Sequence, residues 1–278
     1  MARFVSTTAG VGQLTDGGGV RLLALELTDL GAALQAGFTL RQLADAPTRD
    51  ERPLADVTLL PTIPRPSKIW ALGLAYRDHI AEMNAKPDAE PFFFLKAPSA
   101  LVPSGAAIKL PALAPSCVDY EGEVAFVISR QATNVTAAEA WDHVAGVTIL
   151  NDVSARDVQT GSYREGARPN TSMAKSFDTF CPLGPCLAGW DALPNRDDIA
   201  ITTHVNGERR QGSSTAGLVW PVAELVAFLA ARTTLMPGDV ISTGTPAGVG
   251  APHKRFLQSG DTVRIEVSGV GILENRVA

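Results

Sequence analysis

The stretch Val118-Asp-Tyr-Glu-Gly-Glu-Val-Ala-Phe-Val-Ile128 combines three acidic residues with the apolar pattern of a buried β-strand. Residues i and i+2 of a strand point to the same face, so Asp119, Glu121 and Glu123 are expected to project together. Carboxylates on one buried face repel one another at a cost of several kcal/mol unless a positive charge neutralises them. The stretch therefore predicts a carboxylate cluster that binds a divalent cation.

A third ligand is expected from the next buried strand. Gly146-Val-Thr-Ile-Leu150 has the composition of such a strand, and Asn151-Asp152 follows at its end. Asp152 would complete a set of oxygen ligands with Glu121 and Glu123, and hard oxygen ligands favour Mg²⁺, Mn²⁺ or Ca²⁺ over zinc. The alternative is a set of unrelated acids in loops.

Two basic side chains and an amide are candidate partners of this cluster. Lys175 lies in an apolar segment, where a partly buried ammonium group needs a counter-charge such as the acidic cluster. Arg156 and Gln159 stand three residues apart in a predicted helical turn, and either side chain suits substrate oxygen atoms. A structural ion pair of Arg156 with Asp157 or Glu165 is the alternative.

A candidate general base lies earlier in the chain. The polar stretch Arg77–Met83 predicts a helix after the apolar strand Ile69–Tyr76, and residues three apart on a helix face one another. Glu82 would therefore orient the imidazole of His79 and raise its basicity, as a general base requires. The alternative is a surface helix that carries both residues by chance. The Pro-containing segment 84–91 is typical of a mobile loop and suits a lid.

Lys96 ends the aromatic strand Pro91–Pro98. It is either a surface residue with its stem packed on apolar neighbours or a ligand for substrate.

Composition limits the class of protein. The chain has 278 residues, of which 45% are hydrophobic and 19% are charged, so a sizeable core is expected. A net charge of -5 disfavours nucleic acid as a partner. No stretch approaches the roughly 18 apolar residues of a membrane span, and no signal core is evident. The odd cysteine number fits neither a disulfide framework nor a zinc site, so we predict a cytoplasmic protein with inert thiols at Cys117, Cys181 and Cys186.

The organisation predicted is a small N-terminal domain, residues 1–63, and a catalytic domain, residues 64–278, with the boundary at the Pro61–Pro66 segment. In the first domain, Phe4-Val5 and Val20–Leu25 flank a Gly-rich turn, which indicates a hairpin. A short helix capped by Thr28 is expected next. The second domain has many short strands joined by Gly and Pro turns and few helices, which favours an α+β, mainly β fold. Three histidines have no evident partners and are interpreted as structural or surface residues: His143, His204 and His253.

Taken together, several motifs resemble the fumarylacetoacetate hydrolase family, in particular its acylpyruvase and 2-hydroxyhepta-2,4-diene-1,7-dioate isomerase group. They occur in the family's order over residues 64–278, and they are Gly73-Leu-Ala-Tyr-Arg-Asp-His79, Phe94-Leu-Lys96, Asp119-Tyr-Glu-Gly-Glu-Val124, Asn151-Asp-Val-Ser-Ala-Arg-Asp157 with Gln159, Lys175-Ser-Phe-Asp178, Asn206-Gly207 and Pro237-Gly-Asp-Val-Ile-Ser-Thr-Gly-Thr-Pro246. Ala75 departs from the pattern, because many members carry Asn before the Tyr. This departure concerns the lid, not the metal site.

The resemblance implies a mixed β-sandwich roll, a homodimer, and Mg²⁺ or Mn²⁺ bound by Glu121, Glu123 and Asp152. It also implies that His79 and Glu82 activate water on a lid, with Lys175 beside the metal. The implied substrate contacts are Tyr76, Lys96, Arg156, Gln159 and Thr245.

The activity that the resemblance implies is metal-dependent hydrolysis of a C–C bond in an acylpyruvate-like or other dioxo acid through an enolate. Because the same enolate serves other reactions, an oxaloacetate-type decarboxylase and a keto-enol isomerase are alternatives. A non-catalytic metabolite-binding protein is a remote alternative, which the acid triad and the His79–Glu82 pair disfavour.

Overall fold

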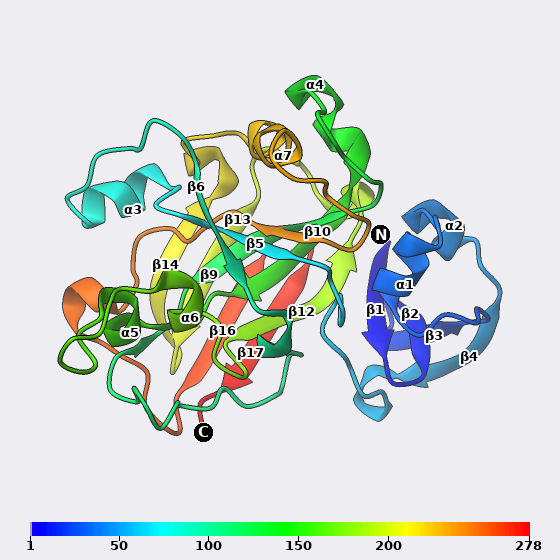
Figure 1. Ribbon diagram of the computed structural model, residues 1–278. Coiled ribbons are helices and arrows are strands. Elements are labelled where there is room, and N and C mark those ends of the chain that lie inside the picture. The colour runs from blue at the N-terminus through cyan, green and yellow to red at the C-terminus, as the bar shows by residue number, and fades with distance from the viewer. Residues whose placement is uncertain (1) are drawn as a thin grey trace.

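The computed structural model describes residues 2–278, of which the largest unit is an eleven-stranded sheet that runs through both halves of the chain (Figure 1). Strands hold 34% of the residues and helices 21%, so the α+β, mainly β class is confirmed. The sheet order is β4 (Thr48–Pro53), β3 (Gly19–Leu23), β2 (Gly10–Leu14), β1 (Arg3–Thr7), β12 (Cys181–Ala188), β10 (Val144–Asn151), β9 (Gly122–Ile128), β15 (Val240–Ser242), β5 (Ile69–Gly73) and β6 (Phe92–Lys96), and β7 (Leu101–Val102) pairs with β12.

A second, four-stranded antiparallel sheet packs against the first. Its order is β14 (Glu208–Ser214), β13 (Ala200–Val205), β16 (Thr262–Val267) and β17 (Gly271–Arg276). The Asn206-Gly207 motif lies in the turn that joins β13 to β14. The sheets approach closely where β9 begins, because a Cβ on Gly122 would lie 2.2 Å from Thr203 Oγ1. All seven residues of β9 are buried, since it is covered on both faces.

The helices are short, and three of them lie on one side of the sheets (Figure 1). These three are α3 (Arg77–Glu82), α5 (Arg156–Thr160) and α6 (Thr171–Ala174), and the others are α1 (Leu30–Gln35), α2 (Leu40–Ala44), α4 (Ala137–Ala140) and α7 (Val222–Ala230). Among residues 2–278, no helix has the length and apolar character needed to cross a membrane.

The N-terminal segment differs from its prediction in two details. The Gly-rich turn joins β2 to β3, so the hairpin partner of Val20 is Leu14, whereas Phe4 lies on the next strand, β1. The strand 10–14 was missed because two glycines interrupt its apolar pattern. The N-cap of α1 is Asp29 and not the predicted Thr28. The Asp29 Oδ1 accepts from Ala32 N–H at 3.0 Å. The boundary at residue 63 stays a prediction.

All three cysteines are free, as expected. Burial raises the pKa of the Cys181 and Cys186 thiols to about 12, which makes both unreactive.

Candidate active site

The acidic cluster forms where β9 begins and β10 ends. These strands are antiparallel, and their register places Asn151 opposite Gly122. Asp152, just beyond β10, donates its backbone N–H to the carbonyl of Glu121 at 2.8 Å, which holds the two segments together. Carboxylate oxygens of Glu121, Glu123 and Asp152 consequently lie within 4.8 Å of one another, and all three residues are buried. The sequence-predicted ligand set is thus one spatial group.

Asp119 is not in this group of three, but it lies beside Glu121, because Arg156 Nη2 is 2.8 Å from Asp119 Oδ2 and 2.6 Å from Glu121 Oε1. The stretch 118–128 is interrupted: β8 (Val118–Asp119) pairs with β11 (Ser154–Ala155), and β9 begins only at Gly122. The break turns the Asp119 side chain toward Arg156 and the backbone of Gly250 and Ala251. The predicted cluster of three acids is therefore only partly right: Asp119 shares Arg156 with Glu121, but the interrupted strand keeps it out of the group formed by Glu123 and Asp152.

Glu123 shows that the cluster needs a further positive charge. Its Oε2 accepts from Ser242 and from Gly244 N–H, but its buried Oε1 has no hydrogen-bond partner among residues 2–278. Burial, together with the charges of Asp152 and Glu121, raises the pKa of Glu123 well above its usual range. An unsatisfied buried carboxylate oxygen within an all-oxygen donor set fits a hard divalent cation. Glu121, Glu123 and Asp152 are the residues that would bind such an ion.

Three cations surround the acids. The Lys175 ammonium group lies 2.6 Å from both Glu121 Oε2 and Asp152 Oδ2, and Lys96 Nζ lies 2.6 Å from Asp152 Oδ1. Arg156 Nη2 lies 2.6 Å from Glu121 Oε1. Burial alone would raise the pKa of Glu121, but the charges of Lys175 and Arg156 outweigh it and lower the pKa below its ordinary value. Glu121 is therefore ionised at neutral pH.

His79 and Glu82 form the predicted pair. On α3, His79 Nδ1 lies 2.8 Å from Glu82 Oε2, and the side chains are only 9% and 13% exposed. Because an ionised carboxylate only accepts hydrogen bonds, Nδ1 carries the proton and Nε2 is left as a proton acceptor. Glu82 Oε1 accepts from Gly248 N–H at 2.9 Å. His253 Nε2 is 3.8 Å from the same oxygen, so this histidine also has a partner, one that its sequence spacing did not reveal.

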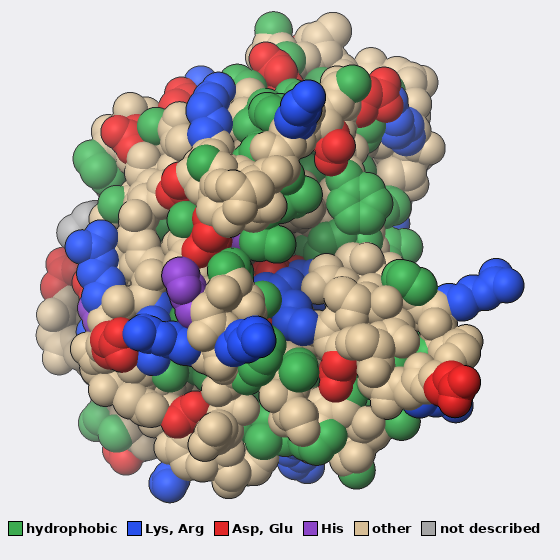
Figure 2. Space-filling view, turned by 90° about the vertical axis from the view of Figure 1, so that its left-hand side faces the viewer, with side chains coloured by type: hydrophobic (Ala, Val, Ile, Leu, Met, Phe, Trp, Pro, Cys, Tyr) green, Lys and Arg blue, Asp and Glu red, His purple; other side chains and the backbone are tan. Residues whose placement is uncertain are grey.

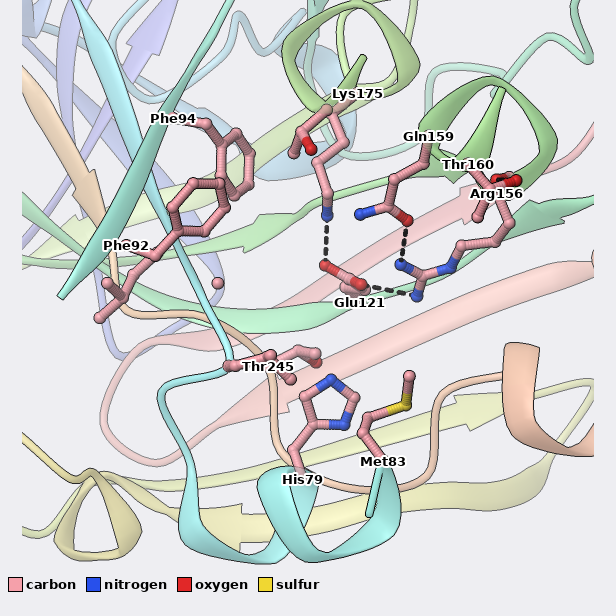
Figure 3. Close-up of a pocket in the computed structure, with 14 residues that line it drawn as sticks. His79, Met83, Phe92, Phe94, Glu121, Arg156, Gln159, Thr160, Lys175 and Thr245 are labelled. Atoms are coloured by element: carbon pink, nitrogen blue, oxygen red, sulfur yellow. Dashed lines mark hydrogen bonds and ion pairs between the residues drawn. The ribbon is translucent and has the colours of Figure 1, made fainter. Parts of the chain in front are cut away.

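A cavity of about 320 Å³ lies between His79 and Glu121, whereas Glu82, Glu123 and Asp152 do not line it. On the face shown in Figure 2 the surface is hollowed near its centre, where hydrophobic side chains border basic and histidine side chains. In Figure 3, His79 on α3 lies below Glu121 and Lys175, with Arg156 and Gln159 to one side and Phe92 and Phe94 to the other. The cavity is lined by Leu72, Gly73, Leu74, His79, Met83, Phe92, Phe94, Glu121, Arg156, Gln159, Thr160, Thr171, Lys175 and Thr245.

Of the implied substrate contacts, Arg156, Gln159 and Thr245 line the cavity, whereas Tyr76 and Lys96 do not. Tyr76 is fully buried, with its hydroxyl 3.5 Å from Thr243 Oγ1. Lys96 is 1% exposed, which excludes a surface position, and it contacts Asp152 and the carbonyl of Lys175 from behind. Its position is that of a support for a metal ligand.

Sequence reasoning missed the apolar part of the lining. Phe92 and Phe94 come from alternate positions of β6, and their ring centroids are 6.2 Å apart. The Phe94 centroid lies 5.0 Å from Lys175 Nζ. The alternation in Phe92-Phe93-Phe94 was a usable signal, but only the fold shows which face of the strand meets the cavity.

Comparison with known proteins identifies the family. A model described as fumarylacetoacetate (FAA) hydrolase C-terminal matches residues 68–278, which is more than half of the chain. The chain therefore belongs to the fumarylacetoacetate hydrolase family.

Named relatives differ in the reaction that their names describe. The chain is 41% identical over 227 residues to oxaloacetate tautomerase FAHD2B, mitochondrial, of Bos taurus, covering 81% of this chain and 71% of that protein. A putative HpcE protein from Mycobacterium smegmatis has a similar crystal structure, with a TM-score of 0.89, 34% identity, and 99% of each chain covered. Maleylpyruvate hydrolase from Sphingobium sp. SYK-6, solved with manganese and pyruvate, gives a TM-score of 0.80 at 28% identity over 99% of this chain and 98% of that one.

Proposed function

We propose that this protein is a divalent-metal-dependent hydrolase that cleaves a C–C bond of an acylpyruvate-type dioxo acid. The observation that supports it best is His79, paired with Glu82, which faces Glu121 and Lys175 across one cavity. An ion at Glu121, Glu123 and Asp152 would be Mg²⁺ or Mn²⁺, and such an ion supplies Lewis-acid stabilisation of negative charge on a chelating 2-oxo acid. The manganese in the Sphingobium structure is consistent with that choice.

The side chains of the cavity supply the proton transfers. His79 Nε2 accepts a proton from water, and Glu82 stabilises the resulting imidazolium. The hydroxide oxygen bonds to the distal acyl carbon, and the bond between that carbon and the methylene carbon breaks. The methylene carbon then takes up a proton, so water is divided between a carboxylic acid and pyruvate. Arg156 and Gln159 would bind oxygens of the substrate, since both line the cavity; Thr245 also lines it, but its hydroxyl already donates to the Gly122 carbonyl.

The apolar side of the cavity favours an uncharged acyl group at the distal end. Leu74, Met83, Phe92 and Phe94 line it, and the two lining cations, Lys175 and Arg156, already pair with buried acids. A second carboxylate would lose its hydration there without gaining an uncommitted cation. Acetylpyruvate is therefore a suitable first substrate.

The test is the hydrolysis of acetylpyruvate in the presence of Mg²⁺ or Mn²⁺. Its rate is measured from the loss of the enol absorbance and from the release of pyruvate. For His79→Ala we expect kcat to fall by about 100-fold or more with little change in KM, because a general base contributes about 10²- to 10⁴-fold. His204→Ala, on β13 away from the cavity, is the control. Unchanged turnover of acetylpyruvate in His79→Ala would remove the pair from the mechanism.

A second candidate is tautomerisation of an oxaloacetate-type acid, which the name of the bovine relative favours. It needs the same acid–base residue but no water. The second candidate would replace the first if the protein consumed enol-oxaloacetate without releasing pyruvate and was inactive on acetylpyruvate.

The homodimer and the cytoplasmic location also stay predictions. Sedimentation of the purified chain tests the first, and fractionation of the source cells tests the second.

A further inference from the structure

Asp119 is a fully buried carboxylate that the proposed chemistry does not use. Its Oδ1 accepts from the backbone N–H groups of Gly250 at 2.7 Å and Tyr120 at 2.9 Å, and its Oδ2 accepts from Ala251 N–H at 3.0 Å. Arg156 adds Nε at 2.9 Å and Nη2 at 2.8 Å from Oδ2. So many charge-assisted contacts fix both the carboxylate and the backbone that donates to it.

The neighbouring residue fixes the same loop. The Tyr120 hydroxyl donates to the carbonyl of Gly248 at 2.8 Å. A Cβ on Gly250 would lie 2.6 Å from Asp119 Oδ1 and 2.3 Å from the Arg255 carbonyl, so the close approach of this backbone requires glycine. The Gly-rich segment 244–250 thus serves as a backbone connector fastened by Asp119 and Tyr120.

The other side of this connector meets the candidate catalytic pair. Gly248 N–H donates to Glu82 Oε1 at 2.9 Å, while Glu82 Oε2 faces His79 Nδ1 at 2.8 Å. The hydrogen bond from Gly248 restricts how the Glu82 carboxylate can turn, and so restricts the position of Oε2. The direction of the His79 ring therefore depends on where the loop holds Gly248.

We propose that Asp119 is a positioning residue for the His79–Glu82 pair, acting through the backbone of residues 248–251. The same carboxylate also orients Arg156, which lines the cavity, so one side chain sets both the base and a substrate-binding group. The inference rests on the proposed function only in so far as the pair carries the reaction.

The first experiment is a double-mutant cycle on acetylpyruvate hydrolysis with Mg²⁺, using Asp119→Asn, Tyr120→Phe and Glu82→Gln. We expect each of the first two to lower kcat by about tenfold in the wild-type background, because residues acting through one another are not additive. In Glu82→Gln, Tyr120→Phe should lower kcat by less than about twofold, and Asp119→Asn should keep only the part of its loss that passes through Arg156. Tyr120→Phe removes only one hydroxyl. If Asp119→Asn does not fold, the cycle of Tyr120→Phe with Glu82→Gln still tests the inference.

Asp239→Asn is the matched control. Asp239 is also fully buried, accepts from the backbone N–H groups of Lys68 and Met236, and pairs with Lys68 Nζ at 2.8 Å, but it lies away from the cavity. We expect Asp239→Asn to lower the melting temperature. Its effect on kcat should be the same in the wild-type background and in Glu82→Gln.

Two further measurements separate this inference from the proposed function. Amide hydrogen exchange of segment 76–83 needs no substrate, and we expect it to increase in Asp119→Asn but not in Asp239→Asn. Mn²⁺ affinity, by calorimetry, should be preserved in Asp119→Asn.

Additive losses in the cycle, unchanged exchange in segment 76–83, or loss of Mn²⁺ binding in Asp119→Asn would each overturn the role of Asp119. Full activity of Glu82→Gln, with exchange changed as expected, would instead overturn the proposed mechanism and leave the positioning of the pair intact.

Discussion

Glu123 shows how one side chain reveals a site for an ion. Its neighbours satisfy Oε2 with a hydroxyl and a backbone N–H, yet within the described part of the chain the buried Oε1 has no donor. Since an unmade hydrogen bond in the interior costs about 1–3 kcal/mol, more for a charged group, such an atom needs a functional reason. A bound divalent cation supplies one.

Glu123→Gln keeps the size of the side chain and removes its charge. We expect its Mn²⁺ affinity to fall by more than about 100-fold, because even indirect supports of a metal typically cost about 10- to 100-fold. Calorimetric titration measures this, and Glu224→Gln, exposed on α7, is the control. Wild-type Mn²⁺ affinity in Glu123→Gln would contradict the assignment.

Lys96 provides a test of buried charge. Lys96→Met leaves the 0% exposed Asp152 side chain with one cation fewer, and removing one partner of a buried pair costs roughly 3–5 kcal/mol. We therefore expect the free energy of unfolding in EDTA to fall by about 3 kcal/mol in urea titrations. The exposed Lys109→Met is the matched control. A similar free energy of unfolding in both variants would mean that Asp152 does not depend on Lys96.

The connector between β15 and the C-terminal sheet acts as one piece. Along its length it contacts Glu123 at Gly244, the Gly122 carbonyl at Thr245, and Glu82 at Gly248. It therefore links the strand that carries the metal ligand to the helix that carries His79. Its glycines permit this close approach, since Gly248 has φ +107°.

Gly248→Ala tests the connector. A Cβ there would lie 2.0 Å from the Arg210 carbonyl, so the loop must shift, and the N–H that Gly248 donates to Glu82 shifts with it. We expect kcat to fall by about tenfold or more, because small misplacements of catalytic groups can cost up to about 100-fold. Mn²⁺ affinity should be retained. Gly18→Ala, also at positive φ (+81°) but with open space around it, controls for backbone strain alone. Equal kcat in the two variants would contradict the connector's role.

The sequence was sufficient where the determining contacts are local or follow from strand alternation. Glu121 and Glu123 are two residues apart, and His79 and Glu82 are three apart on one helix, so their spacing predicts both groups. Asp119 departs from this reasoning because the strand is interrupted between β8 and β9, and its backbone partners Gly250 and Ala251 lie 131 and 132 residues away.

Lys96 shows the same limit. Its contacts are 56 and 79 residues distant, and no pattern around position 96 separates a buried support from a surface lysine. The aromatic lining of the cavity could likewise not be predicted, because it depends on which face of β6 points into the cavity. Distant partners of this kind become visible only once the strand order is known.

The complete fold should respond to the ion because the proposed ligands join β9 and β10 at the middle of the large sheet. A ligand that binds only the folded state stabilises it by about 2.7 kcal/mol at 100 times its Kd. For a chain of this size we expect Mn²⁺ at that excess to raise the melting temperature by roughly 5–10 °C relative to EDTA.

The rise in melting temperature caused by Mn²⁺ should depend on pH. The pKa of Glu123 determines whether it grows or shrinks as the pH increases. In the metal-free protein, burial and the neighbouring acids raise the pKa of Glu123 above the ordinary 4.5, so between these two pKa values the folded state holds a proton that the unfolded state has lost. Metal-free stability from this group is therefore present at low pH and is lost as the pH rises through that interval. Glu121 does not offset this, because its lowered pKa places its titration at more acidic pH.

Because Mn²⁺ replaces the proton on Glu123, the gain in melting temperature from Mn²⁺ should be larger at pH 8 than at pH 6. Scanning calorimetry at both pH values, with Mn²⁺ and with EDTA, measures the difference. Glu123→Gln has no proton to release and should show neither the gain nor its pH dependence, while Glu224→Gln should behave as the wild type. A gain that shrinks between pH 6 and pH 8 would show that the ion binds without ionising Glu123, and the metal site would then have to be built from other ligands.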